Sequence, residues 1–145
     1  MSDRTLADCI DNQQPISILS SASVLEAARM MAAEHCGSIL VVSTAGNLTG
    51  IFTERDLLTK VVAKALEPAT TKVADVMTAA PRTASPTMPV SHALILMRDG
   101  GFRHLPIVNE RGSVLGIFSM RDTLTSELID ADSITRHQEH LGKML

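Results

Sequence analysis

The sequence GIFTERD at positions 50–56 returns as GIFSMRD at positions 116–122, a shift of 66 residues. At the same shift, residues 15–58 align with residues 81–124 without a gap, and 12 of these 44 pairs are identical. Other pairs exchange one apolar residue for another, such as Val41 and Ile107. Two copies are too few for a solenoid, whose units stack in longer arrays. The repeat therefore predicts a duplicated unit whose copies pair about a pseudo-two-fold axis.

Each copy is predicted to contain a strand, a helix, two strands and a second helix, because short β-prone runs alternate with a helical apolar period. In the first copy, the strands are expected over 15–19, 38–43 and 48–52, and the helices over 23–36 and 53–66. In the second copy, the strands are expected over 82–85, 105–109 and 114–118, with helices over 89–99 and from Ser119 onwards. Short helical turns are expected over 6–12 and 73–78, before the first strand of each copy.

The repeat also divides the chain into segments. The expected segments are a first domain over 5–66, a linker over 67–72, a second domain over 73–128 and a polar, helix-forming tail over 129–145. The tail has no counterpart in the first copy.

Composition excludes several classes of function. The 145 residues are enough for one domain-sized core, and 45% of them are apolar. A formal net charge of −3 and an aromatic content of 2% argue against binding nucleic acid. The longest aliphatic run, Ile39–Val42, is far too short to span a membrane, and the first residues do not form a signal peptide. Cys9 and Cys36 lack metal-ligand spacing and fit a reducing compartment, so we expect a cytoplasmic protein.

The repeated motif itself has two interpretations. Thr53–Asp56 and Ser119–Asp122 have the form of capping boxes, which start many helices that bind nothing. A helix start also attracts anions through its unpaired N–H groups and dipole. A carboxylate one turn further can accept hydrogen bonds from ribose hydroxyls, and Arg55 and Arg121 can fork onto phosphate. A nucleotide would satisfy all three groups at once.

Several segments, in order and in both copies, resemble those of the tandem cystathionine-β-synthase-type (CBS) domain pair over residues 5–128. They are VADVMT at 73–78, PRT at 81–83, FRHLPIV at 102–108 and GIFSMRD at 116–122, with first-copy matches at 37–42 and 50–56. The resemblance implies an α+β fold, a disc-like module of two βαββα units that commonly dimerises. It also implies regulatory binding of adenosine ligands: AMP, ADP or ATP, less often NAD or S-adenosylmethionine.

The resemblance carries further residues into the candidate site. Arg103 and His104 form a basic pair that alone would read as solvated, but in the family such residues face the cleft and touch phosphates. Pro106 cannot donate to a sheet, which leaves strand edge free for an adenine, and Thr83 is placed near adenine or ribose by resemblance only. The candidate nucleotide-binding residues are Thr53, Arg55, Asp56, Thr83, Arg103, His104, Pro106, Ser119, Arg121 and Asp122.

The two copies differ at these positions. Gly37 and Ser38 stand where the second copy has Arg103 and His104, and Leu40 stands where it has Pro106. The basic phosphate contacts therefore exist in one copy only, and one dominant site is expected.

These observations predict a non-catalytic regulatory protein that binds an adenosine nucleotide in the cleft between its repeats. Apolar helix positions that would lack cover within one chain predict a homodimer, and an effector protein would receive the signal. These positions include Leu57, Leu58, Val61, Val62, Leu124 and Leu128. The sequence contains no phosphate loop, nucleophile elbow or paired zinc motif, and His137 and His140 fit a solvated helix face better than a metal site. The alternatives are a ligand-free dimerisation scaffold, an NAD or S-adenosylmethionine sensor, and an enzyme acting on a nucleotide.

Overall fold

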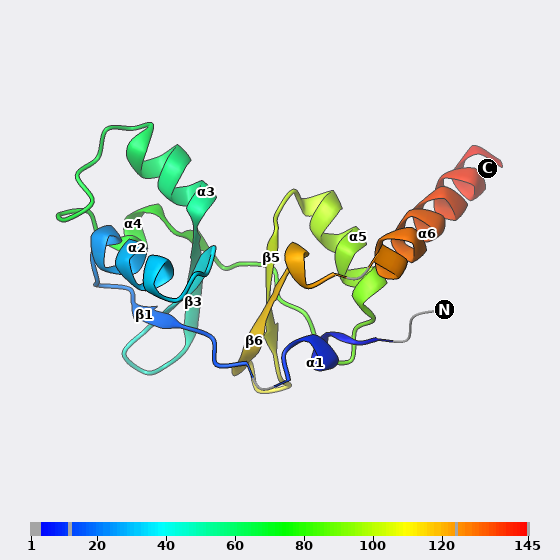
Figure 1. Ribbon diagram of the computed structural model, residues 1–145, viewed down its shortest axis with the longest axis horizontal. Helices are drawn as coiled ribbons and strands as arrows, with labels where there is room; N and C mark the ends of the chain where they lie inside the picture. Colours follow the sequence, from blue (N-terminus) through cyan, green and yellow to red (C-terminus); the bar gives the residue numbers. More distant parts are fainter. Residues whose placement is uncertain (1–3, 12, 124, 145) are drawn as a thin grey trace. The chain divides into compact units, whose positions relative to one another are not determined.

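The computed structural model describes residues 4–11, 13–123 and 125–144, which fold into two compact units (Figure 1). Unit 1 combines the N-terminal segment up to Gln13 with Thr83–Glu110 and the chain from Leu115 onwards. Unit 2 is formed mainly by Gln14–Arg82. Each unit has its own apolar core.

Unit 2 contains a four-stranded sheet in the order β1-β2-β3-β4. β1 is parallel to β2, and the other two pairs are antiparallel. The strands are β1 (Ser17–Leu19), β2 (Ser38–Val42), β3 (Leu48–Thr53) and β4 (Thr78–Ala79). The helical elements are α2 (Val24–Ala33), α3 (Glu54–Asp56), its π-helical continuation η1 (Leu57–Val62) and α4 (Val73–Val76). The core includes Val24, Ile39, Val41, Phe52 and Val61, all fully buried.

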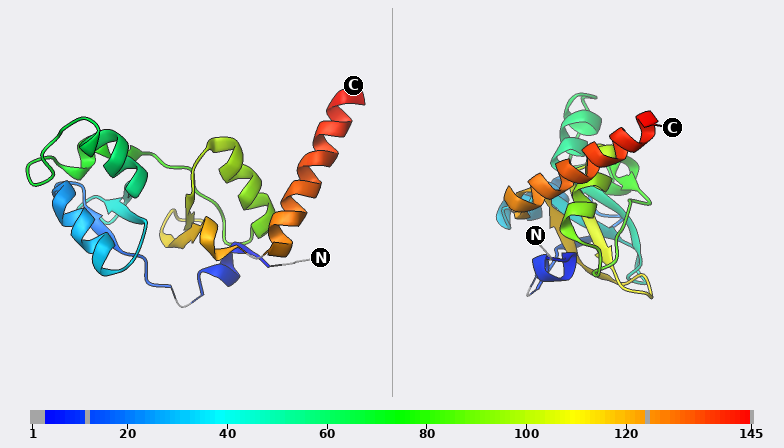
Figure 2. Two further views of the ribbon diagram at one scale, coloured as in Figure 1. Left: turned by 45° about the horizontal axis from the view of Figure 1, so that its top comes forward. Right: turned by 90° about the vertical axis from the view of Figure 1, so that its right-hand side faces the viewer.

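Unit 1 contains the two-stranded sheet of β5 (His104–Val108) and β6 (Val114–Ser119), bridged in parallel to Ala84. The helical elements are α1 (Leu6–Cys9), α5 (Val90–Gly100), the 3-10 turn η2 (Met120–Asp122) and α6 (Thr125–Met144). The first turns of α6 pack beside α5, and its far end projects beyond α5 (Figure 2). Leu6, Leu105, Ile107 and Phe118 lie in the core.

The short helices α1 and α4 pack with the copy that does not follow them in the sequence. The N–H of Leu6 donates to the Met88 carbonyl at 2.9 Å, within unit 1. The N–H of Val73 donates to the Ala22 carbonyl at 2.8 Å, within unit 2. The packing units are therefore offset from the repeats of the sequence, because each repeat completes its core with the turn that precedes the other one.

The two matching glycines of the repeat permit close contact beside β3 and β6. A Cβ on Gly50 would meet the Met77 sulfur and would lie 2.8 Å from the Thr78 carbonyl oxygen on β4. A Cβ on Gly116 would lie 2.7 Å from Oε1 of Gln13. That side-chain amide accepts from the N–H of Ile117 at 2.8 Å and donates to its carbonyl at 3.0 Å. Gln13 thus pairs with β6 through its side chain, where the first copy uses the backbone of β4.

The final helix departs from the sequence-based expectation. A helix was expected from Ser119, but η2 ends at Asp122 and Thr123 is extended, with φ −82° and ψ 142°. At the equivalent position of the first copy, Leu57 has helical angles and the helix continues. Thr123 bonds to the Met120 carbonyl with both its N–H and its hydroxyl, which ends the turn. α6 then runs without interruption into the region expected as the tail.

Candidate functional site

The first-copy motif holds its carboxylate in a closed set of contacts. Asp56 is 5% exposed, and its Oδ2 accepts from the N–H of Thr53 at 3.1 Å. The Thr53 hydroxyl accepts from the Asp56 N–H at 3.1 Å, which completes a capping box. The Thr78 hydroxyl lies 3.2 Å from Oδ1 of Asp56, and the Lys60 ammonium lies 3.0 Å from the same oxygen. Both carboxylate oxygens are therefore occupied by groups of the protein.

The second-copy motif leaves its carboxylate more accessible. Oδ2 of Asp122 accepts from the N–H of Ser119 at 3.0 Å, the same capping arm as in the first copy. The side chain is half-buried. Lys60 is replaced by Ser126 at the equivalent position, so no cation comes from this point of the second copy. Among the described residues, no side chain forms an ion pair with the Asp122 carboxylate.

The basic pair and the second-copy motif lie together within unit 1. The N–H of Met120 donates to the Arg103 carbonyl at 3.2 Å, so the residue before β5 and the start of η2 are directly joined. Arg103 and Arg121 are exposed, and His104 is half-buried. The first copy makes the same backbone contact, from Glu54 to Gly37 at 3.0 Å, but without a basic side chain there. The structure thus joins the main chain of Arg103 to the turn that carries Arg121.

The remaining second-copy candidates border the same strand. The Pro106 carbonyl accepts from the N–H of Ala84 at 3.0 Å, and the N–H of Val108 donates to the Ala84 carbonyl at 3.0 Å. The N–H and the carbonyl of one strand residue point to the same side of the strand. Because the Pro106 carbonyl bonds to Ala84, the N–H that proline lacks is missing on this same edge of β5, the edge that faces Ala84. Pro106 is buried, and Thr83, next to Ala84, is exposed. The expected free edge is therefore flanked by the segment that carries Thr83.

The helix-dipole argument does not apply to the second copy. η2 has three residues, and a macrodipole requires a longer run of aligned peptides. In the first copy, α3 and η1 together form a longer helical run that starts at Glu54. Any anion at the second-copy turn must therefore be held mainly by side chains such as Arg103 and Arg121.

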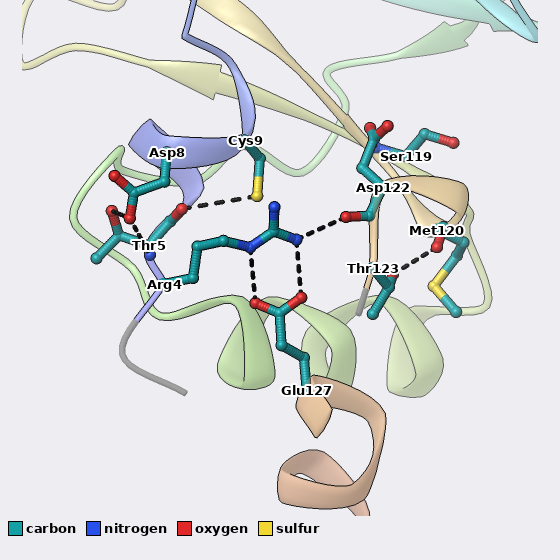
Figure 3. Close-up of polar contacts among 9 residues, drawn as sticks. All are labelled: Arg4, Thr5, Asp8, Cys9, Ser119, Met120, Asp122, Thr123 and Glu127. Atoms are coloured by element: carbon teal, nitrogen blue, oxygen red, sulfur yellow. Dashed lines mark hydrogen bonds and ion pairs between the residues drawn. The ribbon is translucent and has the colours of Figure 1, made fainter. Parts of the chain in front are cut away.

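A buried ion pair that the sequence does not reveal lies behind this turn (Figure 3). Arg4 forks onto Glu127 of α6, with Nε 3.0 Å from Oε2 and Nη2 2.8 Å from Oε1. The same Nη2 donates to the Asp122 carbonyl at 2.6 Å. Glu127 is 1% exposed. The hydrogen bonds that Arg4 donates to Glu127 raise the pKa of Arg4 above its ordinary value, although partial burial opposes this.

Local sequence signals differ for the residues that were missed. Lys60 lies four positions after Asp56 on one helix, a spacing that favours an ion pair and was open to prediction. Arg4 and Glu127 are 123 positions apart, and neither belongs to a motif.

Cys9 is half-buried beside this cluster, and burial raises the pKa of its thiol, while the charge of Arg4 lowers it.

The described part of the chain contains neither a metal cluster nor a membrane-spanning helix. Within residues 4–11, 13–123 and 125–144, no group of three His, Cys, Asp or Glu side chains is placed to hold a metal ion. His137 is exposed, and the side chains of Glu139 and His140 lie outside the described part. No helix in the described part of the chain combines the length and apolar character that crossing a membrane requires.

Comparison with known proteins finds one family twice in the chain. The family model of the CBS domain matches twice, over residues 7–63 and 73–127. An uncharacterized protein of Methanopyrus kandleri is 37% identical over 105 residues, which are 72% of this chain and 54% of that protein, so this chain spans about half the length of that relative.

Two solved structures show the same fold. A CBS-domain protein of Pyrobaculum aerophilum, complexed with AMP, has a TM-score of 0.80 at 24% identity, and the match covers 89% of this chain and 98% of the other. The CBS-domain pair of protein MJ0100, in complex with 5′-methylthioadenosine and S-adenosylmethionine, has a TM-score of 0.67 at 29% identity, covering 74% and 87%. With both repeats matched by the family model and the fold shared with CBS pairs, this chain belongs to the CBS-domain family.

Proposed function

We propose that this chain is a non-catalytic regulatory module that binds an adenosine nucleotide at the second-copy turn. The observation that supports the proposal is the hydrogen bond from the Met120 N–H to the Arg103 carbonyl, which joins the main chain before β5 to the start of η2. The turn then offers one accessible carboxylate for ribose and cationic side chains for phosphate. The AMP bound to the Pyrobaculum aerophilum protein supports this ligand class.

Charge favours a phosphate-bearing ligand over S-adenosylmethionine. Arg121 lies in the turn, Arg103 is joined to it through its carbonyl, and arginine forks match phosphate oxygens. The sulfonium of S-adenosylmethionine carries a positive charge, which these arginines would repel. AMP, ADP, ATP and NAD all present phosphate, whereas adenosine provides the matched ligand without it.

Occupancy of the carboxylates favours a single dominant site. Asp56 already accepts from Thr53, Thr78 and Lys60, so a ribose would have to displace contacts of the protein. Asp122 makes one such contact in the described structure. Thr53, Arg55 and Asp56 would then form a weaker site or a structural element, and we assign the ribose to Asp122.

Calorimetry tests the proposal. Wild-type protein is titrated with adenosine, AMP, ATP, NAD and S-adenosylmethionine, and one phosphate-bearing ligand is expected to bind near one equivalent per chain. A ligand at 100-fold over its Kd also adds about 2.7 kcal/mol of stability, which a thermal shift detects. No heat and no thermal shift with any of the five ligands at millimolar concentration would reject the proposal.

The Arg103→Ala variant tests the assignment of the phosphate. It is expected to weaken AMP and ATP by roughly tenfold or more and adenosine little, because the lost contact is charge-assisted. Arg98→Ala is the matched control, since it removes an exposed arginine of the same unit that pairs with Asp99. Equal losses for adenosine and AMP in Arg103→Ala would show that this side chain does not hold the phosphate.

Exposed apolar residues support self-association as part of the same function. On η1, Leu58 is 62% and Val62 61% exposed, and on α6, Leu128 is 47% and Ile129 61% exposed. Of the other positions expected at an interface, Val61 is buried, Leu57 is half-buried, and Leu124 lies outside the described residues. We therefore expect a dimer of this chain, and light scattering that returns a 15.5 kDa monomer at tens of micromolar would contradict it.

A further inference from the structure

Arg4 is fixed in place before its side chain makes any contact. Its carbonyl accepts from the N–H of Val90 at 3.0 Å, at the start of α5. The neighbouring Thr5 is bridged to Pro89, and the N–H of Leu6 is bound by Met88. The backbone around Arg4 is therefore anchored to α5, and the guanidinium reaches its partners from a defined position.

The guanidinium joins three segments of unit 1. It comes from the N-terminal segment, forks onto Glu127 in the first turn of α6, and donates to the carbonyl of Asp122 at the end of η2 (Figure 3). All three groups lie within unit 1. The donor is cationic and its acceptor is a main-chain oxygen, so the contact is a charge-assisted hydrogen bond.

The bond to Asp122 occupies an acceptor that a continuing helix would need. In an α-helix the carbonyl of residue i accepts from the N–H of residue i+4. The Asp122 carbonyl is instead held by Arg4, and the Met120 carbonyl is held by Thr123. In the first copy, Leu57 follows Asp56 with helical angles and the helix runs on. Two contacts thus occupy carbonyls that a continuing helix would need after Asp122, and one of them comes from the guanidinium of Arg4.

We propose that Arg4 is a positioning residue, which fixes the Ser119–Asp122 turn for ligand binding and links it to the start of α6. This inference rests on the proposed function, because the turn is the one assigned to the nucleotide. Arg4 does not touch the ligand. It holds the end of the turn whose carboxylate binds ribose, and the same cation neutralises a buried residue of α6. Ligand binding and the docking of α6 therefore depend on one side chain.

The test replaces the pair without leaving a buried charge. Arg4→Ala alone would strand Glu127, and such a variant can fail to fold. The double variant Arg4→Met/Glu127→Leu removes both charges with side chains of similar volume, a change that buried pairs tolerate. It still deprives the Asp122 carbonyl of its donor. Glu127→Gln is the companion variant, since it keeps the bond from Arg4 to Asp122.

Two readouts are measured on each folded variant, the Cα chemical shift of Thr123 and the affinity for AMP. In the double variant, the Thr123 shift should move from its extended value towards the helical one. AMP affinity should fall at least about fivefold, the lower range of coupling between linked sites. Glu127→Gln should retain the wild-type shift and lose less affinity, and Arg98→Ala should change neither readout.

The outcomes separate this inference from the proposed function. If wild-type protein does not bind AMP or the other phosphate ligands, the proposed function fails, and the Thr123 shift still decides whether Arg4 sets the turn. If wild-type protein binds AMP and the folded double variant has the wild-type shift and affinity, the positioning role is overturned. A moved shift with unchanged affinity also overturns it, because the turn would then not matter for binding.

Discussion

Replacing each aspartate of the repeated motif by alanine should separate a structural carboxylate from a binding one. Asp56→Ala removes the acceptor for the Thr53 N–H, the Thr78 hydroxyl and the Lys60 ammonium. Asp122→Ala removes the acceptor for the Ser119 N–H. The two variants make the same chemical change at equivalent positions, and only their surroundings differ.

The expected magnitudes follow from these contacts. A hydrogen bond to a charged group contributes about 1.5 kcal/mol at the lower end, and an i,i+4 ion pair with a half-exposed lysine about 0.5 kcal/mol. Asp56→Ala should therefore lower the free energy of unfolding by about 3.5 kcal/mol, from two hydrogen bonds and one ion pair. Asp122→Ala should lower it by about 1.5 kcal/mol, from one hydrogen bond. With about 3 °C per kcal/mol for a chain of this size, the Tm values should fall by about 10 °C and about 5 °C.

AMP affinity should show the reverse order. Asp122→Ala should weaken AMP by roughly ten- to a hundredfold, because ribose hydroxyls lose a charged acceptor. Asp56→Ala should leave the affinity nearly unchanged at a temperature where it is folded. Thermal unfolding and calorimetry are measured on both variants, with Asp99→Ala as control, since that residue forms an exposed pair with Arg98. A stable Asp56→Ala protein with weakened AMP, beside an Asp122→Ala protein that binds normally, would refute the reasoning.

Further changes test other parts of the structure. Gly50→Ala should destabilise the protein by about 1–3 kcal/mol in denaturant unfolding, because its Cβ would overlap the backbone of β4. Gln13→Ala should cost about 1–2 kcal/mol in the same assay, since both bonds to Ile117 are lost. Gln13→Glu should restore only the bond accepted from the Ile117 N–H, because a carboxylate cannot donate to the Ile117 carbonyl. Cys36 is exposed and should be alkylated before the half-buried Cys9, as read by peptide mass spectrometry. Burial raises the pKa of the Cys9 thiol in the folded protein above its ordinary value of 9.0. The protonated thiol therefore stabilises the fold below about pH 9, and this contribution is lost as the pH rises through the folded pKa. Cys9→Ala should not show this loss of stability at high pH.

Most of the strands were predictable because the physical signal for them is local. The strand expected over 82–85 is wrong, since only Ala84 forms an isolated bridge there, and β4 was not predicted. Ser38–Val42 is an aliphatic and β-branched run, and the structure places β2 there. The turn around Gly46 has φ +86°, a conformation that glycine adopts without strain. The same signals recur 66 residues later, so the repeat supplied an internal check on both copies. The order of helices and strands in each repeat followed from these patterns, whereas the CBS pair was implied by the resemblance of the motifs.

The packing of the short helices was not predictable from the sequence. α1 and α4 each have four residues, too few to define an amphipathic face that selects a core. Leu6 is fully buried in unit 1 and Val73 in unit 2, although each precedes the repeat that forms mainly the other unit. Local sequence predicts such a turn but carries no information about which of two similar cores it completes.

The second-copy turn shows that a repeated motif can have different surroundings in its two copies. The motifs at 50–56 and 116–122 share the capping arm from N–H to carboxylate. They differ in what lies around it: Lys60 and Thr78 bind the first carboxylate, whereas Arg4 binds a carbonyl of the second turn. The contacts of Lys60 and Thr78 occupy the Asp56 carboxylate. The contact of Arg4 holds the main chain at Asp122 and leaves the Asp122 carboxylate accessible. We therefore propose that the contacts of Lys60, Thr78 and Arg4, which all lie outside the motif, make the first turn structural and leave the second suited to a ligand.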